Sequence, residues 1–280
     1  METKSLKLPS SHFVPSGTCD MPQQPGFKLL KISDTFHLNL SPCHGNGALA
    51  VPEGRAILPT LEHLLGLPFI LKIATQDWHP PGHISFASSH TSATATTLDG
   101  AHCEPAPYTT YTIITNPSNA TETYQTRLWP DHCIQETWGA RLLPPLLAHH
   151  HHIDHVIQKG GLARVEMYSA FYAPLQQPRV GDSGLAALLR ARAVSHVFVV
   201  GLAADYCVRA TAEDAVHEGW TAGRTLIVDE GTRAVDQDEW ETKGRVEVEG
   251  AGVRVVKVDG HEVRRVRELA SKIPCTSAQE

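Results

Sequence analysis

The feature that most constrains the fold is an alternation of short apolar runs with amphipathic segments along most of the chain. Apolar runs of this length are typical of buried strands, and the segments between them have helical spacing. Strands that alternate with helices indicate a mainly parallel central sheet with helices on both faces, an α/β, Rossmann-like three-layer fold. The predicted strands are residues 27–33, 69–75, 153–158, 197–202, 225–228 and 253–258, and the predicted helices are residues 52–65, 185–193, 208–218, 239–248 and 262–271.

Two segments depart from this alternation. The first 25 residues are rich in Ser, Pro, Lys and Gln without periodicity, which predicts a disordered tail. Residues 26–274 are predicted to form a single domain. Residues 88–127, rich in Thr, Ser and Ala in their first part, predict an insertion with a small hairpin around residues 108–114.

The composition excludes several classes of partner. The chain carries 24 Lys and Arg against 30 Asp and Glu, a net charge of −6, which gives no general attraction toward nucleic acid or anionic membranes. Because neither a secretory signal nor a long apolar run is found, we expect an intracellular protein, cytoplasmic or nuclear. The six scattered cysteines are expected to be thiols, and homo-oligomerisation is left open.

A candidate metal site follows the second predicted strand. Asp77 and His79 lie two residues apart, so they face the same side of an extended chain, and a turn at residues 80–82 can return His83 toward them. His132, in Trp-Pro-Asp-His-Cys, is the best candidate to complete the set, with Asp131 and Cys133 as alternatives. Such ligands suit one divalent ion, zinc first, with iron and manganese as alternatives. The other interpretation is a surface strand end with hydrogen-bonded histidines.

A run of four histidines, residues 149–152, is a second candidate. Neighbouring residues in a run cannot all point at one ion, so we interpret this stretch as a solvated loop.

Cys207 lies where a predicted strand gives way to a predicted helix. At a helix start the unpaired N–H groups favour a thiolate, although a lone cysteine is as often an inert core residue. Asp34 and Lys159 also end predicted strands, and parallel topology can bring both beside Cys207. An acid to take the thiol proton and an ammonium to favour thiolate would complete a nucleophile system.

The motifs of the chain, taken together, resemble one enzyme family. The stretch GLAADYCVRAT resembles the nucleophile segment of the cysteine hydrolases related to isochorismatase. With three further stretches in family-like order, the chain is similar to the metal-containing nicotinamidases (pyrazinamidases) of that family, and most similar to the fungal enzymes. The resemblance covers about residues 27–258, and the further stretches are DWHPPGHISF, LWPDHC and KGGLARVEMYSAF.

The resemblance implies catalytic roles for the matching residues. Asp34 would be the proton-accepting acid, Lys159 the orienting cation and Cys207 the nucleophile. A cis peptide would join Leu202 to Ala203, and the amides of Ala203 and Cys207 would form the oxyanion hole.

The resemblance also implies binding residues. Asp77, His79 and His132 would hold the metal, with His83 also a ligand in some members. Trp129, Tyr168 and Phe171 would lie in or near the aromatic pocket for a pyridine ring.

The first-strand loop departs from the family pattern. Nicotinamidases typically read Asp-x-Gln-x-Asp-Phe there, whereas this chain reads Asp34-Thr-Phe36-His-Leu38-Asn39. The acid is kept, and Phe36 and Asn39 would line the substrate pocket in place of the family's residues.

The expected activity is hydrolysis of nicotinamide to nicotinate and ammonia through a thioester on Cys207. Because the altered loop lines the pocket in relatives, another small amide is the first alternative substrate. A catalytically silent, ligand-binding relative is the second alternative.

Overall fold

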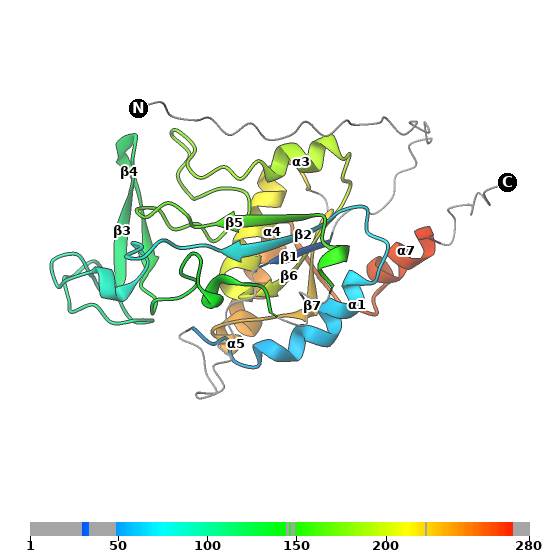
Figure 1. Cartoon of the computed structure of the whole chain (residues 1–280), viewed down its shortest axis with the longest axis horizontal. Helices are drawn as coiled ribbons and strands as arrows, with labels where there is room; N and C mark the ends of the chain where they lie inside the picture. The colour runs from blue at the N-terminus through cyan, green and yellow to red at the C-terminus, as the bar shows by residue number, and fades with distance from the viewer. Residues whose placement is uncertain (1–29, 34–48, 144–145, 147–148, 222, 271–280) are drawn as a thin grey trace, which may run out of the picture.

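Six parallel strands form the central sheet (Figure 1). Each hydrogen-bonded pair of neighbours is parallel, which confirms the predicted sheet. The computed structural model describes residues 30–33, 49–143, 146, 149–221 and 223–270, so the predicted tail lies outside the described residues. Across the sheet, the strand order is β5 (His155–Lys159), β2 (Lys72–Asp77), β1 (Leu30–Ser33), β6 (Val197–Leu202), β7 (Thr225–Arg233) and β8 (Arg254–Val256).

Strand β6 shows why a continuous apolar run is needed at the centre of the sheet. All of its residues are buried. Phe198 and Val200 pack into one hydrophobic cluster, and Val197 and Val199 pack into a second. Because successive side chains of a strand point to opposite faces, the two clusters are the two faces of the sheet.

Helices cover both faces. Helix α1 (Leu58–Leu65) contributes Leu61, Leu64 and Leu65, at helical spacing, to the cluster that contains Phe198. Helix α7 (His261–Ala270) packs into the same cluster. The opposite cluster receives α3 (Leu185–Ala191), α4 (Arg209–His217) and α6 (Arg245–Gly250), and the short α5 (Gln237–Glu239) precedes α6. The predicted three layers are therefore confirmed.

The predicted boundaries are close to the observed ones, with two informative differences. The helix predicted for residues 208–218 begins at Arg209, because residues Ala204–Val208 form a π-helical turn. It is followed by Gly219 with φ 108°, a conformation that suits glycine. The strand predicted for residues 225–228 continues to Arg233. The prediction ended too early because the charged Asp229 and Glu230 interrupt the apolar run.

The hairpin lies further along the chain than predicted. Strand β3 (Tyr111–Asn116) pairs antiparallel with β4 (Asn119–Arg127), whereas the sequence suggested residues 108–114. The turn is formed around Pro117 and Ser118, a turn signal that the prediction overlooked. The hairpin stands to one side of the central sheet (Figure 1).

Parallel topology places the carboxyl ends of β2, β5 and β6 along one edge of the sheet. Ligands of such folds gather beyond this edge. Within the described ranges, no helix combines the length and the apolar character needed to cross a membrane.

Candidate active site

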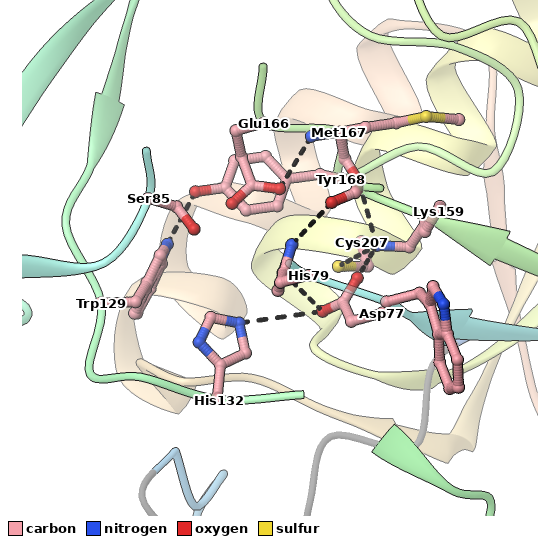
Figure 2. Close-up of polar contacts among 12 residues, drawn as sticks. Asp77, His79, Ser85, Trp129, His132, Lys159, Glu166, Met167, Tyr168 and Cys207 are labelled. Carbon is pink, nitrogen blue, oxygen red and sulfur yellow. Dashed lines mark hydrogen bonds and ion pairs between the residues drawn. The ribbon is translucent and has the colours of Figure 1, made fainter. Parts of the chain in front are cut away.

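Lys159 joins two parts of this edge. In the register of β2 and β5, Asp77 is the partner of Lys159. The Lys159 ammonium donates hydrogen bonds to Asp77 Oδ1 and to Met167 O, and it lies 3.4 Å from Cys207 Sγ (Figure 2). One cation thus contacts both a carboxylate and a thiol.

Cys207 is fully buried in the π-helical turn Ala204–Val208 that follows β6. The turn links the central strand to α4, so the thiol lies where the sheet edge meets the start of a helix. A buried cysteine with only apolar neighbours is inert, whereas a nearby ammonium favours thiolate. The contact with Lys159 supports the interpretation of Cys207 as a nucleophile.

The ion pair of Lys159 and Asp77 is buried, with side chains 0% and 5% exposed. Burial raises the pKa of the Asp77 carboxyl, but the Lys159 ammonium, and then His79 and His132, more than offset this and lower the pKa to about 2. Asp77 is therefore ionised at neutral pH. A buried pair of this kind makes each partner costly to remove alone.

His79 and His132 present ring nitrogens to the same Asp77 oxygen. The Nε2 atom of each lies 3.9 Å from Asp77 Oδ2. The Nδ1 atoms lie 3.0 Å from Gly160 O and 2.7 Å from Pro130 O, so each Nδ1–H donates to a carbonyl and the lone pair is on Nε2. Burial lowers the pKa of both imidazoles, that of His132 to about 4, which favours neutral rings.

Gly160 explains part of this placement. Its φ is 70°, and a Cβ at this position would lie 2.5 Å from His79 Cε1. A side chain there would displace the imidazole. The glycine after Lys159 therefore allows His79 to approach the backbone at the end of β5.

The donor set fits a divalent metal. His79 Nε2 is a buried atom that has no hydrogen-bond partner in the described structure. A buried nitrogen without a partner is costly unless something binds it. A carboxylate oxygen and two neutral imidazole nitrogens suit zinc and other first-row divalent ions.

His83 is brought back toward His79 by the turn at Pro80, with the two ring centroids 4.2 Å apart. Its Nδ1 lies 2.8 Å from Ser85 Oγ and its Nε2 lies 3.1 Å from Val165 O. If Nε2 donates to the carbonyl, Nδ1 accepts from Ser85, and no lone pair is left for a metal. Direct ligation by His83 stays a prediction, and this arrangement disfavours it.

The alternative ligands differ in position. The exposed Asp131 accepts a hydrogen bond from Ser88. Cys133 is buried, and its sulfur lies within 4.8 Å of ligand atoms of Asp77 and His132. The structure therefore keeps Cys133, more than Asp131, as an alternative ligand.

Two aromatic side chains of the predicted pocket lie together near Cys207. Trp129 Nε1 donates to the Tyr168 hydroxyl at 2.8 Å, and that hydroxyl lies 3.0 Å from Thr126 Oγ1. Both rings contact Tyr206, with centroid distances of 4.8 Å from Trp129 and 5.3 Å from Tyr168. These residues share a hydrophobic cluster with Cys207.

Phe171 is not brought to this group. It is buried in the cluster on the other face of the sheet, where its ring lies 6.4 Å from that of Trp220. Its predicted place near the substrate pocket is therefore not supported by its packing. Asp34, Phe36 and Asn39 lie outside the described residues.

The peptide between Leu202 and Ala203 is cis, as the resemblance implied. The oxyanion hole itself stays a prediction for Ala203 and Cys207.

Of the histidine run, the side chains of His149, His151 and His152 are exposed or half-exposed, which agrees with the predicted solvated stretch. His150–His152 form a short 3₁₀ turn, and His149 Nε2 lies 3.9 Å from Glu62 Oε1.

Sequence reasoning missed two residues of the site. Tyr206 precedes the cysteine, and its ring contacts could not be read from a segment at a strand-to-helix junction. Glu166 is buried, with a carboxylate oxygen within 4.8 Å of His79 and His83 nitrogens. Burial raises the pKa of Glu166, but His79 and His83 bring it below its ordinary value. A lone carboxylate within an otherwise apolar stretch, Val-Glu-Met-Tyr, was the available signal.

Comparisons with known proteins agree with this geometry. The family model described as "Isochorismatase domain" matches residues 87–258. The nicotinamidase of Saccharomyces cerevisiae is 30% identical over 75% of this chain and 91% of its own length. The crystal structure of the yeast nicotinamidase bound to the inhibitor nicotinaldehyde aligns with a TM-score of 0.69 at 28% identity, over 82% of this chain and all of that one. The pyrazinamidase of Pyrococcus horikoshii in complex with zinc aligns with a TM-score of 0.53 at 25% identity, over 82% of this chain and 99% of that one.

Proposed function

Because this chain belongs to the family defined by the isochorismatase domain, we propose that it is a metal-containing cysteine amidohydrolase that converts nicotinamide to nicotinate and ammonia. The observation that carries the proposal is the position of Lys159 Nζ, 3.4 Å from Cys207 Sγ and bonded to Asp77. This cation connects a nucleophile to a set of metal-binding residues in one site.

The metal would be held by Asp77, His79 and His132, with zinc as the first candidate and iron or manganese as alternatives. When bound, such an ion acts as a Lewis acid that can hold a pyridine nitrogen. The Gly160 and Pro130 carbonyls orient the two imidazoles, because each accepts the Nδ1–H and leaves the Nε2 lone pair for the metal.

The reaction begins at Cys207. Asp34, which follows β1 in the sequence, takes the thiol proton while the Lys159 ammonium stabilises the thiolate. The sulfur attacks the carboxamide carbon, and the amides of Ala203 and Cys207 hold the oxyanion. When the C–N bond breaks, Asp34 returns the proton to the leaving ammonia, and a thioester remains. A water molecule deprotonated by Asp34 then attacks the thioester, the C–S bond breaks as Asp34 returns that proton to the Cys207 sulfur, and nicotinate is released.

The substrate ring would lie against Trp129, Tyr168 and Tyr206. A flat aromatic ring is bound well by aromatic walls, and the hydrogen bond between Trp129 and Tyr168 holds two of these walls in position. Phe36 and Asn39 would complete the pocket from the first-strand loop.

Another small amide is the second candidate substrate. The altered residues at positions 36–39 support this candidate, because that loop would line the substrate pocket. The third reading, a silent ligand-binding relative, requires ring binding without ammonia release. The contact between Lys159 and Cys207 argues against it.

The test is an ammonia-release assay on nicotinamide, pyrazinamide and aliphatic amides, with metal analysis of the same preparation. Cys207→Ala should lower turnover by roughly three orders of magnitude or more, because it removes the nucleophile. The matched control is Cys103→Ala, a half-buried cysteine outside the site, which should leave turnover unchanged. Retained activity in Cys207→Ala would overturn the mechanism, and faster turnover of a non-pyridine amide would select the second substrate.

A further inference from the structure

A cavity of about 360 Å³ lies beside the β3–β4 hairpin and shares no lining residue with the candidate active site. Its apolar part includes Ile84 and Ile113, and its polar part includes Arg164, His102 and Ser89. A second cavity of about 640 Å³ shares Ile84, Ile113 and Arg164 with it, so the two are neighbouring parts of one groove. Volumes of this size are typical of small-molecule sites.

The polar lining is basic. In the described part of the chain, Arg164 and His102 line the first cavity, and none of the residues that line either cavity is Asp or Glu. This composition contrasts with the whole chain, whose net charge is −6. An unopposed guanidinium in a concave surface attracts small anions, and its planar fork matches the oxygens of a carboxylate or phosphate.

The donors differ in availability. His90 also lines the cavity, but its Nε2 lies 2.6 Å from Ile84 O and its Nδ1 lies 3.1 Å from Thr94 Oγ1, so this ring belongs to the wall. The exposed Arg164 and His102 side chains make no hydrogen bond or ion pair with any other described residue. Arg164 and His102 therefore remain able to donate to a ligand.

The floor of the cavity is held in place by the backbone. Ile84 N donates a hydrogen bond to Ala163 O at 2.8 Å. This bond joins the segment that follows His83 to the segment that follows Lys159. Ile84 and Ala163 both line the cavity, so its walls are set by packing of the main fold, and the site is built before a ligand arrives.

We propose that this cavity binds a small organic oxyanion, a carboxylate or a phosphate monoester, whose charged group is bound by Arg164 and His102 and whose apolar body lies on Ile84 and Ile113. The inference is independent of the proposed amidase activity, since it uses none of the active-site residues.

The experiment is isothermal titration calorimetry of the full chain at low ionic strength with phenyl phosphate, benzoate, inorganic phosphate and the neutral analogue benzyl alcohol. We expect saturable binding of at least one aromatic anion, weaker binding of inorganic phosphate and none of benzyl alcohol. The stronger of phenyl phosphate and benzoate identifies the class of oxyanion.

Variants locate the binding. Arg164→Gln should weaken the aromatic anion at least tenfold, and His102→Gln should weaken it to a smaller extent. The matched control is Arg192→Gln, another exposed arginine remote in sequence from the cavity, which should leave affinity unchanged. Circular dichroism of each variant checks folding. Undiminished binding by Arg164→Gln, equal losses in Arg164→Gln and Arg192→Gln, or no saturable binding of either aromatic anion would overturn the proposal.

Discussion

Lys159 and Arg164 are two cations in one short segment, and they serve two different regions of the molecule. Lys159 is buried at the edge of the parallel sheet, where it contacts Asp77 and Cys207. Arg164 is exposed in the cavity beside the hairpin. Residue type alone therefore does not decide what a cationic side chain does. Its burial and the groups that it contacts decide whether it stabilises a fixed charge or binds a ligand from solution.

The sheet edge pairs its charges before any ligand arrives. Asp77 neutralises Lys159, and the Gly160 and Pro130 carbonyls orient His79 and His132. Fixed dipoles and charges of this kind act strongly on a reacting group, since they are preorganised. The hairpin region leaves its cation in contact with solvent, which suits reversible binding of an anion.

The largest effect on stability is expected from removing the buried cation, with removal of the exposed cation as the control. In protein stripped of divalent metals, Lys159→Met should lower the free energy of unfolding by about 3–5 kcal/mol, because it leaves the Asp77 carboxylate buried without its partner. The control, Arg164→Met, should change it by about 0.5 kcal/mol or less, since an exposed side chain away from special features contributes little. Urea unfolding monitored by circular dichroism measures both.

Equal destabilisation by the two substitutions would contradict this contrast. The double variant Asp77→Asn/Lys159→Met sharpens it, because removal of both charges should recover part of the loss.

The next effect compares two histidines. His79→Ala should lower metal affinity by roughly a hundredfold or more, because it removes one of three proposed ligands. His102→Ala, in the hairpin cavity, should keep the metal content of the unmodified chain. Mass spectrometry of intact protein and elemental analysis after dialysis against a weak chelator measure the content. Stoichiometric metal in His79→Ala would remove this histidine from the proposed ligands.

Much of the sheet edge could be predicted from the sequence, for a physical reason. Carboxyl ends of parallel strands share one edge, so Asp34 and Lys159 could be expected beside Cys207 although they are far apart in the chain. Lys159 does contact Cys207, whereas Asp34 lies outside the described residues. The contact of Lys159 with Asp77 was not part of the prediction.

What could not be predicted depends on packing across the sheet and in irregular segments. The direct pairing of β5 with β2 is a choice of strand order that no local pattern encodes. Phe171 lies in an irregular segment, where periodicity does not decide which face a ring joins, and it packs into the cluster that contains Val197 and Val199. Tyr206 and Glu166 acquire their positions from neighbours distant in sequence.

The smallest effect tests whether the hairpin contributes to the sheet-edge site through a single hydroxyl. The Tyr168 hydroxyl accepts a hydrogen bond from Trp129 and shares a second hydrogen bond with Thr126 Oγ1 of β4, 3.0 Å away. Thr126→Val keeps the shape of the side chain and removes the second hydrogen bond. Loss of one such hydrogen bond is worth about 1 kcal/mol, so KM for the best amide should rise roughly three- to tenfold while kcat changes less. The matched control is Thr115→Val, an exposed threonine of β3, which should leave KM unchanged. Rescue by Thr126→Ser would identify the hydroxyl as the cause, whereas an unchanged KM in Thr126→Val would limit the hairpin's contribution to its own cavity.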